Sequence, residues 1–457
     1  MGTRPTRPGR VIKGHPTRIT LTVVAALALV ASFGFAGCGS STATHSATAP
    51  SNTAPTETPS PTDEVATPTP APATPTVAPT PTPVPTPTPT PTPKPTPTPS
   101  PKPGSIGASN KMDVARVYHT ATLLKNGFVL IAGGENASGI LASAELYNPA
   151  TRTFKLTGSM HQARTDHTAT LLNDGKVYLA GGVGVGGTLS SAEIYNPTTG
   201  TFALTGSLTY ARSRHIAVLL PNGTVLIAGG MDSGGHARAS AETYSETSGH
   251  NSSTTPLANA RSSASATTLV GGKILIAGGV SGDATLYTAE IYSPSTGKFA
   301  ATGSLIQGRA DAAAALLADG RVLIAAGYAY CPGHNPVPPG CIDTGVATAE
   351  IYSPTTGKFT KAGTMAHARG AASVPLPGVV LKDGRVLVAG GSLHNGTSLG
   401  SVELFDPVLD KFISLGSLKY PRGGNTATRL SDGRVLIAGG IDGNLATTRA
   451  SSELYNP

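Results

Sequence analysis

Seven glutamates recur along the chain in one local context, each two residues before an aromatic residue. They are Glu145, Glu193, Glu242, Glu290, Glu350, Glu403 and Glu453. A carboxylate can serve as a general acid, a general base or a nucleophile. An enzyme needs one such site rather than seven, so a residue present in every unit is architectural. We therefore expect each glutamate to pair with a recurring arginine and to fix one unit against the next by charge-assisted hydrogen bonds.

The recurring arginines define the repeat. They are Arg116, Arg164, Arg212, Arg261, Arg309, Arg369 and Arg422, so that successive steps are 48, 48, 49, 48, 60 and 53 residues. A period of this length is typical of stacked supersecondary units, none of which can bury its apolar face alone. Residues 105–457 are therefore predicted to form one repeat domain.

The unit that begins at Arg164 predicts four antiparallel strands. A run of small and β-branched residues follows the arginine, and Asn173-Asp174-Gly175 supplies the turn of a tight hairpin. An apolar second strand ends at Gly181-Gly182, a third strand contains Glu193, and residues 201–206 form the fourth. Seven such units predict an all-β fold, a seven-bladed β-propeller with four antiparallel strands per blade.

The last unit ends at Pro457 after three strands, and the N-terminal part of the domain can supply the fourth. In the register of the other units, Ile106 takes the place that Phe154 has in the first blade. Residues 105–112 would then complete blade seven and close the ring, which removes the open sheet edges. The alternative is an open array of blades or a truncated chain.

The sixth unit carries four extra residues around Pro375-Leu376-Pro377-Gly378. We place this insertion between strands one and two of its blade. It should then bulge on the face from which the chain enters the domain.

A glycine doublet, a Glu-x-Tyr segment, a following aromatic and an Arg-x-x-His segment recur together through residues 105–457, and on these motifs the units resemble kelch repeats. The family's following aromatic is normally Trp, which this chain lacks. Its place is taken by Phe154, Phe202, Phe299, Phe359 and Phe412. The third unit has Asn251 there, so we expect its blade to be the loosest. The resemblance implies a kelch-type propeller, a fold that hosts enzymes and binding modules alike.

Three histidines follow the repeat arginine by three residues in the first three units: His119, His167 and His215. On adjacent inner strands they could face a common channel and bind a metal ion. The resemblance favours the family's usual arrangement, in which each imidazole makes a local hydrogen bond. We therefore assign no metal to them.

Cys331 and Cys341 flank a Pro/Gly-rich insertion in the fifth unit. Outside the cytoplasm, two nearby cysteines usually form a disulfide, which would staple this loop. The alternative is a copper site, because Tyr328, Tyr330 and His334 lie beside them and galactose oxidase shares the kelch fold. The metal ligands of that enzyme cannot be matched here residue by residue, so we expect no cofactor.

The N-terminus predicts export. A basic stretch is followed by an apolar run from Ile19 to Ala36, and the Ala36-Gly37-Cys38 ending resembles a bacterial lipoprotein signal, although Phe35 stands where that signal usually has Leu. We expect residues 1–37 to be the signal peptide and Cys38 to be lipidated. The alternatives are ordinary cleavage, which gives a secreted protein, or an uncleaved span. All three place the repeats outside the cytoplasm.

Residues 38–104 are dominated by Thr, Pro, Ala and Ser. Proline removes backbone donors and few apolar side chains are available, so this stretch is predicted to be a disordered linker. It would hold the propeller clear of the cell envelope.

The net charge of the chain gives no signal for nucleic acid. The formal charge is +8, but five positive charges and no acid lie within the first 37 residues, which leaves +3 for the remainder. That remainder has no Lys/Arg cluster, so we expect no nucleic-acid partner and a membrane contact through the lipid anchor only. We expect a monomer.

The longest and most varied loops join strand two to strand three. By strand direction they share a face with the connections between blades, and this face points away from the linker, as a binding surface should. The candidate binding residues on it are Tyr210, Asp232, His236, Tyr287, Tyr328, Tyr330, His394, Asn395, Tyr420, Asp442 and Asn444.

The sequence therefore predicts a surface-tethered binding or scaffold module that recognises a protein or a glycan, with no catalytic residue assigned. The alternative is a carbohydrate-active enzyme, copper oxidase-like or hydrolytic. Hydrolysis would need a pair of carboxylates that are not part of the repeat at one end of the central channel. A passive envelope protein is a third possibility.

Overall fold

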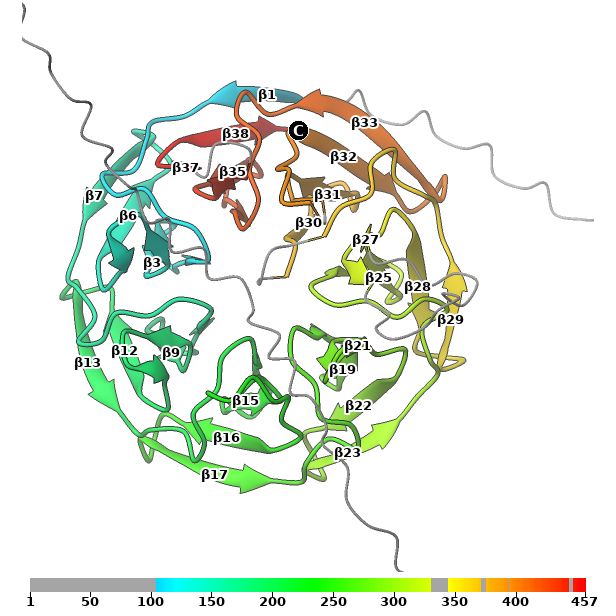
Figure 1. Ribbon diagram of the computed structural model, residues 1–457, viewed down its shortest axis with the longest axis horizontal. Coiled ribbons are helices and arrows are strands. Elements are labelled where there is room, and N and C mark those ends of the chain that lie inside the picture. The colour runs from blue at the N-terminus through cyan, green and yellow to red at the C-terminus, as the bar shows by residue number, and fades with distance from the viewer. Residues whose placement is uncertain (1–103, 330–343, 371–374, 394, 444–446) are drawn as a thin grey trace, which may run out of the picture. The chain divides into compact units, whose positions relative to one another are not determined.

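A computed structural model describes residues 104–329, 344–370, 375–393, 395–443 and 447–457. The predicted signal peptide, Cys38 and residues 38–103 of the linker lie outside these ranges, as do Cys331 and Cys341. The described residues form seven four-stranded antiparallel sheets arranged around a central channel (Figure 1). The predicted seven-bladed propeller is thus confirmed. Within the described ranges, no helix has the length and apolar character needed to cross a bilayer.

Each blade contributes its first strand to the channel and its fourth to the outer rim (Figure 1). Blade one consists of β2 (Thr120–Leu123), β3 (Val129–Ala132), β6 (Ala144–Asn148) and β7 (Thr153–Leu156). Blade two consists of β8 (Thr168–Leu171), β9 (Val177–Ala180), β12 (Ala192–Asn196) and β13 (Thr201–Thr205). Blade three consists of β14 (Ile216–Leu219), β15 (Val225–Ala228), β16 (Ala241–Ser245) and β17 (His250–Thr254).

The next three blades follow the same order. Blade four consists of β18 (Ser265–Thr268), β19 (Ile274–Ala277), β22 (Ala289–Ser293) and β23 (Lys298–Ala301). Blade five consists of β24 (Ala313–Leu316), β25 (Val322–Ala325), β28 (Ala349–Ser353) and β29 (Lys358–Lys361). Blade six consists of β30 (Gly378–Val380), β31 (Val386–Ala389), β32 (Ser401–Asp406) and β33 (Lys411–Ser417).

Blade seven joins the two ends of the domain. It consists of β34 (Thr426–Arg429), β35 (Val435–Ala438), β38 (Ser452–Asn456) and, as its outer strand, β1 (Ser105–Ala108). Ile106 lies opposite Tyr455, as Phe154 lies opposite Tyr147 in blade one. The predicted closure of the ring by the N-terminal strand is therefore confirmed.

The core lies between the blades. The second strand is buried along its whole length in every blade. Its side chains pack against the neighbouring blade, so that Leu130 of blade one shares a cluster with Tyr195 and Phe202 of blade two. The same pairing closes the ring, because Leu436 of blade seven clusters with Val129 and Tyr147 of blade one. No blade buries its apolar faces without both neighbours.

Short two-stranded ribbons extend several of the loops between strands two and three. They are β4–β5 (Glu135–Asn136, Gly139–Ile140), β10–β11 (Val183–Gly184, Gly187–Thr188), β20–β21 (Val280–Ser281, Ala284–Thr285), β26–β27 (Tyr328–Ala329, Thr344–Gly345) and β36–β37 (Ile441–Asp442, Thr447–Thr448). Each loop bridges to the connection that enters its own blade, as Glu135 does to Val117. We call the face that these loops and connections share the variable-loop face.

The glycine doublets allow neighbouring blades to approach through their backbones. Gly181 has a φ of 59°, and a β-carbon there would lie 2.4 Å from the carbonyl oxygen of Arg212 in the next blade. The next glycine, Gly182, donates its N–H to that same oxygen at 2.9 Å. A larger residue would push the two blades apart. Ala326 takes the first glycine's place in blade five, also at positive φ.

The insertion of blade six is not where we predicted it. The hairpin between β30 and β31 has the usual length, with the N–H of Leu381 bonded to the carbonyl of Arg385. The extra residues instead precede β30, and Leu376 donates its N–H to the carbonyl of Asp311 at 3.0 Å. The insertion therefore lines the central channel rather than bulging on the opposite face. Strand one and the extra residues both lie between the repeat arginine and the Asp-Gly turn. The sequence alone therefore could not show whether the extra residues precede or follow the strand.

Blade three compensates for its missing aromatic. In five other blades a tyrosine or phenylalanine of strand three packs on the following Phe with ring centroids 4.8–5.1 Å apart. In blade three, Tyr244 instead stacks on Tyr178 of blade two, with centroids 4.0 Å apart and ring planes 14° apart. The side-chain amide of Asn251 donates to the carbonyl oxygens of Gly206 and Ser207. Tyr178 of the neighbouring blade thus packs on Tyr244, as the following Phe does in those five blades.

This stack predicts a coupling between residues 178 and 251. Tyr178→Leu should lower the free energy of unfolding by about 1–3 kcal/mol, because an aromatic contact is lost and a cavity remains. In the Asn251→Phe background the same change should cost at least about 1 kcal/mol less, since the usual aromatic pair is restored. Urea unfolding of the four proteins measures the coupling, and strictly additive effects would contradict this account.

Candidate functional site

The repeat arginines and glutamates pair in all seven blades. The N–O distance lies between 2.7 and 3.0 Å in six of them, and Arg369 and Glu403 form the seventh pair. In blade two, Arg164 also donates to the carbonyls of Gly181 at 2.8 Å and Ser191 at 3.1 Å. The carboxylate of Glu193 accepts the backbone N–H groups of His161 and Gln162, at 2.8 and 3.1 Å.

These pairs act within a blade, which differs from the cross-blade role that we predicted. The glutamate holds the connection that arrives from the preceding blade, and the arginine ties the ends of strands two and three to it. Contact between blades is made by the arginine's carbonyl, which accepts from the glycine doublet of the blade before. All fourteen side chains are at most 3% exposed, so each pair is enclosed within its blade.

The three histidines do not converge on a common point. Each imidazole Nε2 pairs with a threonine hydroxyl of the preceding blade: His119 with Thr426 at 3.0 Å, His167 with Thr120 at 3.1 Å and His215 with Thr168 at 2.8 Å. Burial and the nearby repeat arginines lower the pKa of His119 to about 3, and burial lowers that of His215 to about 3. They are neutral and tie inner strands together.

A ring of backbone hydrogen bonds surrounds the channel on the variable-loop face. It runs through residues that follow the repeat arginine by two positions, each of which has a φ between 51° and 60°: Tyr118, Asp166, Arg214, Ser263, Asp311 and Gly424. From Tyr118 through Asp311, the N–H of each member donates to the carbonyl of the member before it, beginning with Tyr118 to Gly424, at 2.9 to 3.4 Å. In blade six, Leu376 of the insertion donates to Asp311 instead. The backbone of this ring is regular, whereas its side chains vary from blade to blade.

Side chains that are not part of the repeat give the ring an acidic arc. The carboxylate of Asp166 accepts from Nε of Arg214 at 3.1 Å, and the carboxyl group of Asp311 interacts with Arg214 and with the Ser263 hydroxyl. Both aspartates are 7% exposed, and Oδ1 of each has no hydrogen-bond partner in the structure. Buried carboxylate oxygens normally have partners, so these two are suited to receive donors from a ligand or water.

Burial controls the protonation of this arc. It raises the pKa of Asp311 to about 7, against the opposing effects of Arg214 and Ser263. Burial also raises the pKa of Asp166, which Arg214 partly offsets. Glu135 on the adjacent loop has a raised pKa for the same reason, with a further contribution from Asp166. Acids with shifted pKa values that gather around one opening mark a candidate functional site.

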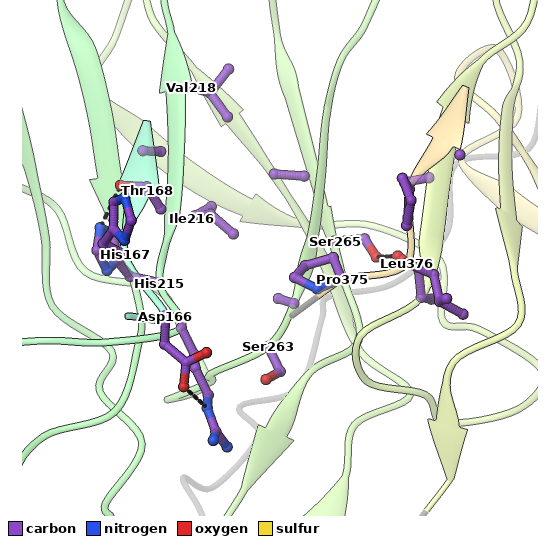
Figure 2. Close-up of a pocket in the computed structure, with 18 residues that line it drawn as sticks. Asp166, His167, Thr168, His215, Ile216, Val218, Ser263, Ser265, Pro375 and Leu376 are labelled. Carbon is purple, nitrogen blue, oxygen red and sulfur yellow. Dashed lines mark hydrogen bonds and ion pairs between the residues drawn. The ribbon is translucent and has the colours of Figure 1, made fainter. Parts of the chain in front are cut away.

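A cavity of about 380 Å³ opens inside the ring (Figure 2). Asp166, Arg214 and Ser263 line one end of it. The wall beyond is largely apolar and includes Ile216, Val218, Ala264, Ala312 and Leu376. The space exists because alanines stand in blades four and five where blades one to three carry histidine. The site was not predicted, since its residues belong to no motif; comparing the repeats position by position would have singled them out as the members that vary.

Four predicted binding residues form two matching groups on the variable-loop face. In blade three, the guanidinium of Arg238 lies 5.0 Å from the ring centre of Tyr210 and pairs with Asp232 at 3.5 Å. In blade seven, Arg449 lies 5.1 Å from the ring centre of Tyr420 and pairs with Asp442. Tyr210 and Tyr420 are 48% and 37% exposed. We call these groups the Tyr–Arg–Asp groups.

The other predicted binding residues are scattered. Tyr287 and Asn395 are exposed loop residues, Tyr328 is half-buried in β26, and His236 lies 3.4 Å from Asp232. Tyr330, His394 and Asn444 lie outside the described residues. Among the described residues, no predicted binding residue lines the channel cavity.

Few of the side chains considered for a copper site lie within the described ranges. Of its candidate side chains, the two tyrosines and His334 beside the cysteine loop, only Tyr328 is described. Among the described residues, no group of three or more His, Cys, Asp or Glu side chains is placed to hold a metal ion.

Comparison with known proteins agrees with the repeat. The kelch motif model matches residues 164–208, 261–304 and 375–419. This is a kelch-repeat seven-bladed β-propeller. Beta-scruin of Limulus polyphemus is 38% identical over 64 residues, which are 14% of this chain and only 7% of that protein's length. The kelch assignment thus rests on the repeats, while the activity and partners of whole relatives do not transfer with it.

Two solved structures share the fold. A fungal alcohol oxidase of the AA5 family, solved in complex with copper, superposes with a TM-score of 0.62 at 16% identity, over 78% of this chain and 76% of its own. YjhT superposes with a TM-score of 0.53 at 14% identity, over 66% of this chain and 98% of its own. At these identities the likeness concerns the kelch fold alone.

The buried pairs of the kelch propeller predict that removing a framework charge lowers the free energy of unfolding far more than removing a surface charge. Glu193→Gln leaves the Arg164 guanidinium buried without its counter-charge, so the free energy of unfolding should fall by about 3–5 kcal/mol. Asp432→Asn, which breaks the exposed pair with Arg434, should cost less than about 1 kcal/mol. Chemical denaturation of both variants tests this, and equal losses would contradict the structural role.

The acidic arc predicts a pH dependence of stability. An unfolded aspartate has a pKa of about 3.9, so the folded protein keeps a proton on Asp311 between about pH 4 and pH 7 that the unfolded chain has released. This contribution is lost as pH rises through 7. The free energy of unfolding of the parent protein should therefore fall by about 2–3 kcal/mol more than that of Asp311→Asn when the pH is raised from 5 to 8. Urea unfolding at both pH values measures it. Asp283→Asn, an exposed loop change, is the control and should leave the pH dependence unaltered.

Proposed function

We propose that this kelch propeller is the binding module of an exported, lipid-anchored cell-surface protein, and that its variable-loop face recognises a protein or a glycan. The observation that carries the proposal is the pair of Tyr–Arg–Asp groups on that face. The side chains that hold the blades together repeat in every blade, whereas these exposed groups occur only in blades three and seven among the described residues. Residues that do not serve the framework are free to serve recognition.

The Tyr–Arg–Asp groups have the properties of contact residues. Tyrosine offers a large, rigid aromatic surface with a polar tip, and tyrosine and arginine are enriched among residues that dominate binding energy. The aspartate holds the arginine, and the arginine lies over the tyrosine ring, so little side-chain freedom remains to be lost on binding. Aromatic rings fixed in this way suit both a protein surface and the apolar face of a sugar.

The anchoring part of the proposal rests on the N-terminal sequence and on the direction of the chain. Gly104, the first described residue, donates to the hydroxyl of Tyr455, and β1 starts beside Asn456. This is the end of blade seven opposite to its variable loops. A chain that enters there from a lipidated Cys38 leaves the variable-loop face open to partners.

The enzymatic alternative has less support. Acids outside the repeat do gather at one end of the channel, as a hydrolase would require. However, Asp166 is held by Arg214, and Asp311 lies against Ser263 and is not among the side chains that line the cavity. A glycosidase presents both carboxyl groups to the scissile bond. The geometry therefore favours binding.

Binding of residues 104–457 to a glycan array and to the cell-wall fraction of the parent organism tests the proposal. Replacing Tyr210 and Tyr420 together by Ala should weaken specific binding by about tenfold or more, since each aromatic contact is worth on the order of 1 kcal/mol or more. Leu156→Ala, an exposed apolar change on the outer strand β7, is the matched control and should have no effect. Binding that survives the double replacement would contradict the proposal. Binding to the cell-wall fraction without any glycan hit would indicate a protein partner.

A further inference from the structure

The channel cavity is a second site, and its lining includes neither Tyr210 nor Tyr420. Its volume of about 380 Å³ falls in the range of small-ligand pockets. Asp166, Arg214 and Ser263 lie at one end of it, and the walls beyond are mainly aliphatic side chains of blades three to six, with Thr168 and Ser265 among them (Figure 2). A ligand for this cavity therefore has one polar end and one aliphatic end.

The polar end has an excess of negative charge. The carboxyl groups of Asp166, Asp311 and Glu135 all interact with Arg214, the one guanidinium group assigned to this arc within the described ranges. His167 and His215 also line the cavity but are neutral, because burial lowers their pKa. The charge of the arc thus favours a cation.

Asp166 identifies the atom that such a cation would contact. Its Oδ2 accepts from Arg214, while Oδ1 has no partner although the side chain is more than nine-tenths buried. In Figure 2, this second oxygen points away from Arg214 toward the open space. A buried carboxylate oxygen of this kind costs free energy until a donor reaches it.

We propose that the channel cavity binds a primary amine carried on a short aliphatic chain. The ammonium group donates to Oδ1 of Asp166 and offsets the excess negative charge of the arc, and the aliphatic chain lies between Ile216, Val218 and Leu376. An ammonium group has three donors and no acceptor, which matches a site whose open atoms are acceptors. A polyol fits less well, because most of the wall is apolar and offers few partners to its hydroxyls.

The probes are n-butylammonium, 1-butanol and butyrate, added separately to residues 104–457. They share one chain and differ in the charge at its end. Isothermal titration and ligand-observed NMR should detect n-butylammonium and neither of the other two. N-acetyl-lysine methylamide separates two sources of the same chemistry. If it binds more tightly than n-butylammonium, the natural occupant is a lysine side chain of a partner, and if it binds more weakly, the occupant is a free amine.

Two variants act on the site by different routes. Ala312→His restores the histidine of blades one to three, with the Ser265 hydroxyl available where the other blades offer threonine, and fills the cavity without altering an acid. Asp166→Asn removes the contacting charge. Each should weaken n-butylammonium binding by about tenfold or more, the effect expected for losing a hydrogen bond to a charged group. Asp283→Asn is the charge-matched control and should bind like the parent protein.

Several outcomes would overturn the proposal. Butanol that binds as tightly as n-butylammonium would mean an apolar pocket without charge selection. Amine binding that survives in a folded Ala312→His variant would place the amine elsewhere, and no detectable amine binding would exclude the site. Thermal unfolding of each variant, followed by circular dichroism, verifies folding before binding is compared. The array experiment with the Tyr210/Tyr420 variant uses different residues, so either proposal can fail without the other.

Discussion

Seven buried guanidinium–carboxylate pairs are the interaction on which the rest of this propeller depends. Each arginine reaches the ends of two strands, and each glutamate holds the connection that delivers the chain from the blade before. A buried charge without a counter-charge costs free energy, so the loss of either partner of a pair strongly destabilises the blade. This requirement fixes where every blade begins. The apolar clusters between blades are built from the strands that these pairs hold together.

The sequence allowed the framework to be predicted because the framework repeats. The period gave the number of blades, the Arg and Glu positions gave the buried pairs, and the missing fourth strand pointed to residues 105–112. What failed was local and belonged to single blades. The insertion near Leu376 was placed on the wrong side of strand one, since only its flanks are marked by repeat residues. The stack of Tyr178 on Tyr244 was also missed, because it joins an unusual residue of one blade to a gap in the next.

The candidate channel site illustrates the same limit. Asp166, Arg214 and Asp311 are ordinary polar residues in sequence, separated by about one and about two repeat lengths, and no motif connects them. They meet because the closed ring brings the same position of successive blades together. Burial raises the pKa of Asp311 to about 7. The sequence of one repeat does not show how deeply that residue is buried. A residue-by-residue comparison of repeats finds the framework where they agree and the candidate sites where they differ.

The backbone ring around the channel has a consequence for how such a protein can change. Its members hold a left-handed backbone conformation by hydrogen bonds between main-chain atoms, so tyrosine, aspartate, arginine, serine and glycine are all accommodated at equivalent places. Main-chain hydrogen bonds stabilise that conformation, so it does not depend on the kind of side chain. Blades two, three and four thus each present one replaceable side chain to the same small space. A mutation at one of these places alters the chemistry of the opening and leaves the architecture intact, so that new specificities can be explored one blade at a time.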